Sequence, residues 1–568
     1  MSLAERPPTF AELFTPKLVT ILREGYRLAH VRADLVAGLT VAIVALPLSM
    51  AIGIASGASP AQGLYTAIVG GFLVSALGGS RFQIGGPAGA FIVLVAATAQ
   101  AHGMDGLILA VLLSGLLLVA AGYLRLGTYI KFIPYPVTVG FTAGIAAIIF
   151  ASQIKDLLGL TLGAPEPGPI LEKLPVLWAA LPTVNAATAA LAVATIAIIL
   201  AFRRWRPHWP GMMIAIALTA AASAALGLQV ETIGTRFGGI PHSLPAPAWP
   251  AFTWAKVVAV LPSALALALL GAIESLLSAV VADGMTGRRH RSNCELVGQG
   301  VANVATAFFS GISVTGTVAR TATNVRAGAH GPFAGMFHAL FLLAFVLLAA
   351  PLASHIALAS LAGVLAVVAW NMVEKHAFAM LLRASRGDAA VLLVTLGLTV
   401  FRDLIEAIVL GFALGSVLFI HRMSKTTGVE TDRPFVAEDK ADDLFGQRAP
   451  YDEASSSDRD VMVYRISGAF FFGAAASIGA VLERIHDSHK ALVVDFSAVP
   501  FVDATAANTM GGLARRAQRR NVALILSGTS AAVRRDLEAH GLVPPAVGYA
   551  PTIQAARRGI RVTAGAND

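Results

Sequence analysis

The sequence predicts a polytopic α-helical membrane protein that ends in a small α/β domain. Of its 568 residues, 56% are hydrophobic and only 13% are charged, whereas soluble domains carry roughly 25% charged residues. The apolar residues gather in runs close to the roughly 20 residues that a helix needs to cross a bilayer. Two further runs are interrupted, and they fall at matching positions in the two halves of the membrane region. Beyond residue 424 the chain turns polar, and short strand-like and helical patterns alternate.

Composition also narrows the function. The single cysteine, Cys294, excludes an internal disulfide framework and a Cys-based zinc cluster. The net charge is +9, but the basic residues cluster between apolar runs, which indicates membrane orientation rather than a nucleic-acid partner. The sequence has no GxxxxGK[ST] loop and no HExxH motif. We therefore expect no enzyme, no cofactor and no metal, and an ion gradient or the substrate's own gradient as the energy source.

The chain begins with residues 1–32, which lack the apolar run of a signal peptide and are predicted to be a cytoplasmic amino-terminal segment. Residues 33–424 are predicted to form the transmembrane domain. Its continuous apolar segments are 34–55, 60–78, 104–123, 133–153, 184–202, 210–228, 256–282, 295–310, 332–352, 355–373, 388–403 and 404–421.

The two interrupted segments are 83–100 and 313–329. Counting both predicts fourteen spans, in which the interrupted ones are the third and the tenth, the same position in each half of a seven-plus-seven arrangement. Interrupted segments at corresponding positions indicate an inverted-repeat transporter and its substrate site. The alternative is that Gly85-Gly86-Pro87 is a simple helix kink. The matched pair favours the site.

The second interrupted segment has the features of an anion site. Ser313, Val314 and Thr315 favour an extended backbone, Gly316 breaks it, and a helical pattern follows with Arg320 one turn in. The start of such a half-helix presents free N–H groups and a positive dipole end, which favour an anion. Non-helical backbone at membrane depth occurs only where it is buried in protein or lines a water-filled cavity. The segment therefore predicts an anion site within the membrane.

An acidic residue, Glu274, lies in the middle of the apolar segment 256–282. An ionisable group at mid-bilayer costs several kcal/mol unless it is neutralised, paired or hydrated, so it indicates a functional site. Ser278 is one turn further on and shares its helix face. We predict that Glu274 binds a proton coupled to anion occupancy. The alternative is a structural ion pair between Glu274 and Arg320 that holds two helices together.

Basic residues set the orientation. They follow the even-numbered spans, so those ends and the amino terminus are predicted to be cytoplasmic. These residues are Arg203, Arg204, Arg206, Arg288, Arg289, Arg291, Lys375, Arg383, Arg386, His421, Arg422 and Lys425.

The polar tail is predicted to contain a solvated linker at 425–459 and a cytoplasmic α/β domain at 460–568. About 110 residues suffice for one small domain. Its predicted strands are 461–466, 491–496 and 522–527, and its predicted helices are 474–488, 504–519 and 530–541.

Several stretches together resemble the sulfate permease family of anion transporters, whose fold is shared by the animal anion exchangers and the motor protein prestin. The tail resembles the STAS domain. The stretches that carry the resemblance are 33–47, Gly86-Pro87, Gly271 to Ser275, Gly298-Gln-Gly300 and Gly316 to Gly328. The resemblance implies a core domain and a gate domain, transport by an elevator movement of the core, a homodimer, and a substrate site between the two half-helices.

Carried over by position, the resemblance implies that the half-helices offer backbone amides to the anion, with Arg320 behind them. Glu274 matches the coupling acid, and Ser278 supplies a hydroxyl that sodium-coupled relatives also have. Some relatives carry a threonine where this chain has an alanine after Pro87. The implied substrate-binding residues are Ala88, Gly89, Ala90, Thr317, Val318, Ala319 and Arg320.

In related soluble STAS domains a phosphorylatable serine follows an aspartate at the start of a helix. The matching residues here are Asp503 and Thr505, so Thr505 is a candidate phosphosite. The alternative is that Asp503 is an ordinary helix N-cap.

The sequence thus predicts a secondary transporter in the bacterial inner membrane. We expect proton-coupled symport of sulfate, bicarbonate or a C4-dicarboxylate. One alternative is a sodium-coupled bicarbonate symporter, and another is a non-transporting receptor or scaffold that signals through its STAS domain. A scaffold has no need of buried irregular backbone, which favours transport.

Overall fold

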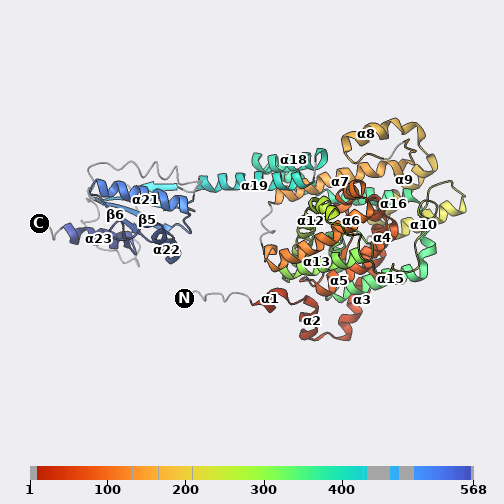
Figure 1. Ribbon diagram of the computed structural model, residues 1–568, viewed down its shortest axis with the longest axis horizontal. Helices are drawn as coiled ribbons and strands as arrows, with labels where there is room; N and C mark the ends of the chain where they lie inside the picture. The colour runs from red at the N-terminus through yellow and green to blue at the C-terminus, as the bar shows by residue number, and fades with distance from the viewer. Residues whose placement is uncertain are drawn as a thin grey trace, which may run out of the picture. The chain divides into compact units, whose positions relative to one another are not determined.

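The computed structural model describes residues 9–128, 134–163, 166–206, 209–402, 404–426, 428–431, 461–471 and 491–564. The chain divides into two compact units, residues 1–413 and 414–568 (Figure 1). The division falls within helix α19 (Leu404–Thr426), whose last turns belong to the second unit.

The first unit is mainly helical, and each continuous apolar segment of the sequence coincides with helical structure. The helices are α3 (Leu28–Ala55), α4 (Pro60–Tyr65), the π-helical turn η1 (Thr66–Gly70), α5 (Gly71–Leu77), α6 (Ile92–Tyr123), α7 (Tyr135–Leu158), α9 (Ala186–Trp205), α10 (Gly211–Ala225), α12 (Trp254–Thr286), α13 (Ser292–Phe308), α15 (Phe333–Ala353), α16 (Leu358–Met372), α18 (Arg386–Phe401) and α19. Shorter helices lie outside the predicted spans: α1 (Phe10–Phe14), α2 (Lys17–Gly25), α8 (Ile170–Ala179), α11 (Ile233–Phe237) and α17 (Lys375–Ala384).

Within the part of the chain that the structure describes, nine helices are long and apolar enough to cross a membrane by themselves. Several other helices fall short because they contain only 15 to 17 residues, as in α10, α13 and α18. The count of fourteen spans therefore stays a prediction.

Both interrupted segments are interrupted in the structure. Short strands, β1 (Gly85–Gly86) and β2 (Thr315–Gly316), precede the half-helices. One half-helix begins with the 3-10 turn η2 (Gly89–Phe91) and continues into α6, and the other is α14 (Val318–Arg326). Within α6, Gly103 has φ 71° and ψ 177°, a conformation that only glycine adopts without strain. This break separates the two segments that the sequence predicts at 83–100 and 104–123.

The helices of the first unit pack in two groups. In one group α6 packs against α12 and α13, and α3 packs against α15 and α14. In the other, α7 packs against α16 and α18, and α9 packs against α10 and α16. Each group combines helices from both halves of the chain. The half-helices belong to the first group.

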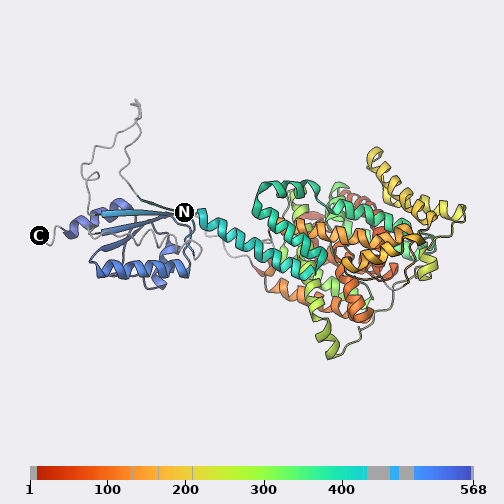
Figure 2. The same ribbon diagram turned by 90° about the horizontal axis from the view of Figure 1, so that it is seen from above.

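The second unit is built on a five-stranded sheet in the order β3 (Gly428–Thr431), β4 (Val461–Ser467), β5 (Ala491–Ala498), β6 (Ala523–Ser527) and β7 (Gly548–Ala550). β3 pairs antiparallel with β4, and the other pairs are parallel. Figure 2 shows helices on both faces of this sheet. They include α21 (Ala504–Arg519), α22 (Ala531–Ala539) and α23 (Ile553–Ala564).

The three strands predicted in the tail coincide with β4, β5 and β6, because these strands are buried and rich in β-branched and aliphatic residues. β3 lies in the stretch that the sequence analysis assigns to the linker. The predicted helix at 474–488 falls outside the described residues.

Candidate functional site

The two interrupted segments meet at the antiparallel pairing of β1 with β2, where Gly85 faces Gly316. Further hydrogen bonds extend this junction on both sides. Thr317 N donates to Ile84 O (3.0 Å), and Ile84 N donates to Thr321 Oγ1 (3.1 Å). The half-helices that follow therefore start from one shared centre.

A stripe of polar side chains on α13 holds β2 in place. Glu295, Gln299 and Asn303 are spaced four residues apart, so they share one helix face. Asn303 Nδ2 donates to Val314 O (2.8 Å) and Val314 N donates to Asn303 Oδ1 (3.0 Å). The Asn303 side chain thus makes the two hydrogen bonds to the Val314 backbone that a neighbouring strand would otherwise make. Gln299 Nε2 donates to Thr315 Oγ1 (3.0 Å).

Both half-helices begin without a side-chain cap. Their N-cap residues are Ala88 and Thr317, and the Thr317 hydroxyl donates to Ile84 O (3.2 Å) instead of capping its helix. The first N–H groups of a helix have no partner within the helix, so uncapped starts favour an anion.

The accessible positions at these helix starts are few. Ala319 is exposed, and Gly89 and Val318 are half-buried. Ala88, Ala90 and Thr317 are buried. Among the residues that the sequence analysis assigns to substrate, the ones open to a small molecule thus offer backbone rather than polar side chains.

Arg320 lies behind the helix starts and is only 2% exposed. Its Nη2 donates to Ser49 Oγ on α3 (3.2 Å), while Nε and Nη1 have no hydrogen-bond partner. The guanidinium lies against Gly86, where an added Cβ would come 2.0 Å from Nη1. A buried cation with unpaired N–H groups is costly unless a negative charge lies nearby. The arrangement is therefore one that an anion stabilises.

Glu274 is partly buried on α12, and the structure does not pair it with Arg320. Within the described residues no carboxylate lies at ion-pair distance from that guanidinium. The Ser278 hydroxyl donates to Thr321 Oγ1 (3.0 Å), which ties α12 to α14. Glu274 thus lies one turn from a direct link to the second half-helix. The structural ion pair that the sequence allowed is not formed.

A second buried acid, Glu295, escaped the sequence analysis. Ser80 N donates to Glu295 Oε2 (2.8 Å), and the Ser275 hydroxyl, which donates to Glu295 Oε1 (3.4 Å), accepts from Gln83 Nε2 (2.6 Å). This chain of contacts links α12, α13 and the segment before β1. The four-residue spacing from Glu295 to Asn303 was the signal that could have shown a polar face directed at the site.

The close approach of Arg320 to Gly86 gives a testable consequence. Gly86→Ala should displace the guanidinium from Ser49 and reduce anion uptake about tenfold at low substrate, the loss of one charge-assisted hydrogen bond. Gly284→Ala is the matched control, because a Cβ there meets nothing within 4 Å. The measurement is initial uptake rate by equal amounts of folded protein. Wild-type uptake by Gly86→Ala would contradict this role of the glycine.

In the second unit, Asp503 is the N-cap of α21 and accepts a hydrogen bond from Ala506 N (2.8 Å). Thr505 is exposed in the first turn of that helix. The capping role of Asp503 is thus confirmed, and phosphorylation of Thr505 stays a prediction. At the carboxyl end of β5, burial raises the pKa of Asp495, but hydrogen bonds from Ser497, Arg465 and Ser527 outweigh burial and hold that pKa below its ordinary value.

Comparison with known proteins agrees with this architecture. The model of the sulfate permease family matches residues 31–395, and the STAS domain model matches residues 455–556. The chain is 39% identical to the "Putative sulfate transporter YvdB" of Bacillus subtilis (strain 168), over 91% of this chain and 95% of that protein. It is 31% identical to the "Bicarbonate transporter BicA" of Picosynechococcus, over 91% of this chain and 92% of the relative.

Two solved structures share the fold. The overall structure of SLC26A9 matches with a TM-score of 0.83 at 17% identity, covering 97% of this chain and 93% of that one. The transmembrane domain of the cyanobacterial bicarbonate transporter BicA matches with a TM-score of 0.61 at 33% identity, covering 67% of this chain and 98% of that one.

The apolar helices and the two half-helices that meet at the β1–β2 pairing are those of a multi-pass membrane protein, and the relatives of this chain are named as transporters. The chain belongs to the sulfate permease family of anion transporters and carries a STAS domain at its carboxyl end.

Proposed function

We propose that this protein takes up a small oxyanion or carboxylate by proton-coupled symport, with the anion held between the starts of the two half-helices. The observation that carries the proposal is Arg320, a buried guanidinium with two unpaired nitrogens behind two uncapped helix starts. The positive potentials of the two helix starts and of the Arg320 guanidinium coincide at one place. A single small anion there interacts favourably with all three groups.

Sulfate, bicarbonate and C4-dicarboxylates are the proposed substrates. The similarity to a protein named as a sulfate transporter and to one named as a bicarbonate transporter supports the first two. With Ala88 at the start of one half-helix, selection rests on backbone N–H groups and charge. Such a site accepts anions that differ in shape, provided that they are small.

The proposed coupling group is Glu274, with Ser278 as its neighbour one turn away. The Ser278 hydroxyl donates a hydrogen bond to Thr321 on α14. Protonation of Glu274 would therefore change the charge one helical turn from the contact between α12 and the second half-helix. We propose that protonation and anion binding occur together, and that the α6 and α12–α15 group then moves as an elevator against the α7 and α16–α18 group. The amino terminus and the STAS domain are proposed to be cytoplasmic, in a homodimer in the inner membrane.

The test is anion flux in proteoliposomes that contain the full chain. Labelled sulfate, bicarbonate or fumarate should enter faster when the outside is more acidic than the inside. Glu274→Gln should remove this acceleration while the protein stays folded, because an amide cannot carry the proton. Asp536→Asn is the control, since Asp536 is an exposed acid on α22, outside the membrane domain.

Each other outcome of this experiment has a defined meaning. An unchanged pH response in Glu274→Gln would remove Glu274 from the coupling. Acceleration by a sodium gradient alone would replace the proton by sodium, with the Ser278 hydroxyl as a candidate ligand. No flux of any of these anions would favour the receptor or scaffold.

A further inference from the structure

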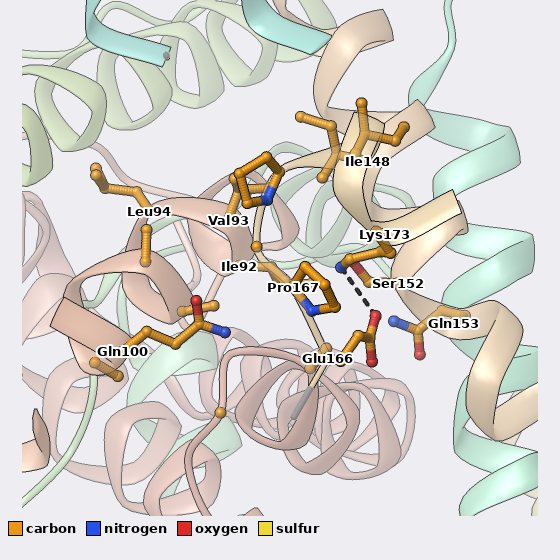
Figure 3. A pocket seen from close by; sticks show the side chains of 18 of the residues that line it. Ile92, Val93, Leu94, Gln100, Ile148, Ser152, Gln153, Glu166, Pro167 and Lys173 are labelled. Atoms are coloured by element: carbon orange, nitrogen blue, oxygen red, sulfur yellow. Dashed lines mark hydrogen bonds and ion pairs between the residues drawn. The ribbon is translucent and has the colours of Figure 1, made fainter. Parts of the chain in front are cut away.

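A cavity of about 840 Å³ lies where α3 and α7 end and where α6 breaks at Gly103. One wall comes from the first half of α6, and the opposite wall from α7 and α8. Figure 3 shows Gln100 on the α6 side and Lys173 on the other, with Glu166 and Pro167 between them. The segment that carries Glu166 also lies against α6, since a Cβ at Gly168 would be 3.1 Å from Gln100 Oε1.

The two faces of α8 explain why a lysine points into this cavity. Leu171, Leu174 and Trp178 follow helical spacing and are exposed on one face. Lys173 and Leu177 are buried on the other. Lys173 is only 6% exposed and lines the cavity. Its ammonium group is therefore a buried charge in the cavity wall and not a surface charge.

The Lys173 ammonium has two partners. It forms an ion pair with Glu166 Oε1 (2.9 Å) and donates a hydrogen bond to Ser152 Oγ (2.8 Å). An ammonium group has three donors, so one remains for a ligand. A lysine this deeply buried needs an anionic partner. In this structure that partner is a side chain of the protein itself.

The lining of the cavity carries more basic than acidic side chains, and Lys155 is the one without an ion-pair partner among the described residues. Four basic and two acidic side chains line it: Lys155, Lys173, Arg236, Arg402, Asp156 and Glu166. Arg236 pairs with Asp156 (3.2 Å) and Glu231 (3.7 Å), and Arg402 pairs with Glu406 (3.6 Å). Among the described residues no carboxylate lies at ion-pair distance from Lys155. Such a positive, partly enclosed cavity concentrates anions.

We infer that this cavity contains a second anion site, in which an incoming oxyanion or carboxylate binds Lys173 and Ser152 in place of the Glu166 carboxylate. A carboxylate and bicarbonate share the same planar O–C–O group, so Glu166 occupies the site as a tethered analogue of the ligand. Exchange keeps the lysine paired throughout, which avoids the cost of a bare buried cation. Ile92 and Val93, at the start of α6, line the same cavity, so the cavity extends to the first half-helix of the proposed central site.

This inference rests on the proposed function for its orientation: with the amino terminus in the cytoplasm, α3 ends outside, and the cavity receives anions before uptake. Lys173→Gln should therefore raise the KM for sulfate or bicarbonate uptake about tenfold, the loss of one charge-assisted contact. Glu166→Gln should lower that KM, because the competing carboxylate is gone. Lys173→Arg should restore most of the affinity.

Uptake into cells is the first measurement, because substrate then arrives only from outside. The matched control is Lys256→Gln, an exposed lysine in the first turn of α12 that does not line the cavity. Its KM should equal that of the wild type. If Lys173→Gln and Glu166→Gln shift KM in the same direction, or leave it unchanged while both lower the melting temperature, the pair is a structural contact and the inference is wrong.

A binding measurement separates this site from the central one. The full chain in lipid nanodiscs, with Arg320→Ala to weaken the central site, is titrated with sodium sulfate and sodium bicarbonate by calorimetry. Residual binding that disappears on adding Lys173→Gln supports the second site, even if the wild type transports neither anion and the proposed function fails. Residual binding that is unaffected by Lys173→Gln, or absent, overturns it.

Discussion

Arg320→Ala should weaken anion binding about hundredfold, which corresponds to about 3 kcal/mol for a buried charge that faces an anion. The guanidinium is fully enclosed, with Nε and Nη1 unpaired beneath the starts of both half-helices. Water screens this buried charge less than it screens a surface charge, so the guanidinium attracts the anion more strongly. Transport at low substrate should fall by the same factor, whereas the maximal rate should fall less.

The control for this experiment is Arg326→Ala, an exposed arginine in the last turn of the same helix α14. It removes the same charge from the same element without touching the site, so its affinity should equal that of the wild type. Arg320→Lys should recover part of the affinity, because charge is kept while the bond to Ser49 is lost. Affinity is measured as the dissociation constant for sulfate and for bicarbonate. Wild-type affinity in Arg320→Ala would refute the assignment of this residue.

Asn303→Leu should cause the largest loss of stability. The Asn303 amide donates to Val314 O and accepts from Val314 N and from the Ser313 hydroxyl (3.2 Å), while Val314 O also accepts a longer bond from Gln299 Nε2 (3.5 Å). Leucine has similar volume but leaves Val314 N and the Ser313 hydroxyl without this partner and Val314 O with only the long bond from Gln299, at a cost of about 1–3 kcal/mol for each unpaired group. The sum is comparable to the total stability of many domains, about 5–15 kcal/mol. We expect strong loss of folded protein, read as melting temperature and as monodisperse yield in detergent.

Asn371→Leu is the matched control, since Asn371 is exposed at the end of α16 and only accepts a bond from Arg203 Nη1 (2.7 Å). Its melting temperature should change little. Asn303→Gln should be intermediate, because the amide is kept but displaced by one methylene. If Asn303→Leu melts at the wild-type temperature, β2 is held by other contacts than the α13 stripe.

Much of the fold could be predicted because it follows from local patterns. The apolar runs predicted the helices of the first unit, and the apolar, β-branched run from Val461 to Ile466 predicted β4. The breaks near Gly86 and Gly316 gave two half-helices, and the structure confirms that both segments are interrupted and adjacent. These features depend on residues within a few positions of one another, where spacing and backbone preference decide the outcome.

Other features could not be read locally. β3 lies in an acidic stretch that reads as linker, and it is a strand because β4 offers an unpaired edge. From the sequence, Glu274 and Arg320 are two opposite charges within apolar segments, which suggests an ion pair. The sequence does not show that the Arg320 guanidinium donates to Ser49 on a third helix instead. Lys173 looks like a loop cation until Ser152 and Glu166 are brought to it.

The sequence by itself determined the class of protein, the helical segments and the two broken ones, because hydrophobicity and helix-breaking residues act locally. Only the tertiary structure decided which polar groups meet. A buried donor or acceptor takes whichever partner the packing of distant helices places within about 3 Å, and spacing along the chain carries no record of that distance.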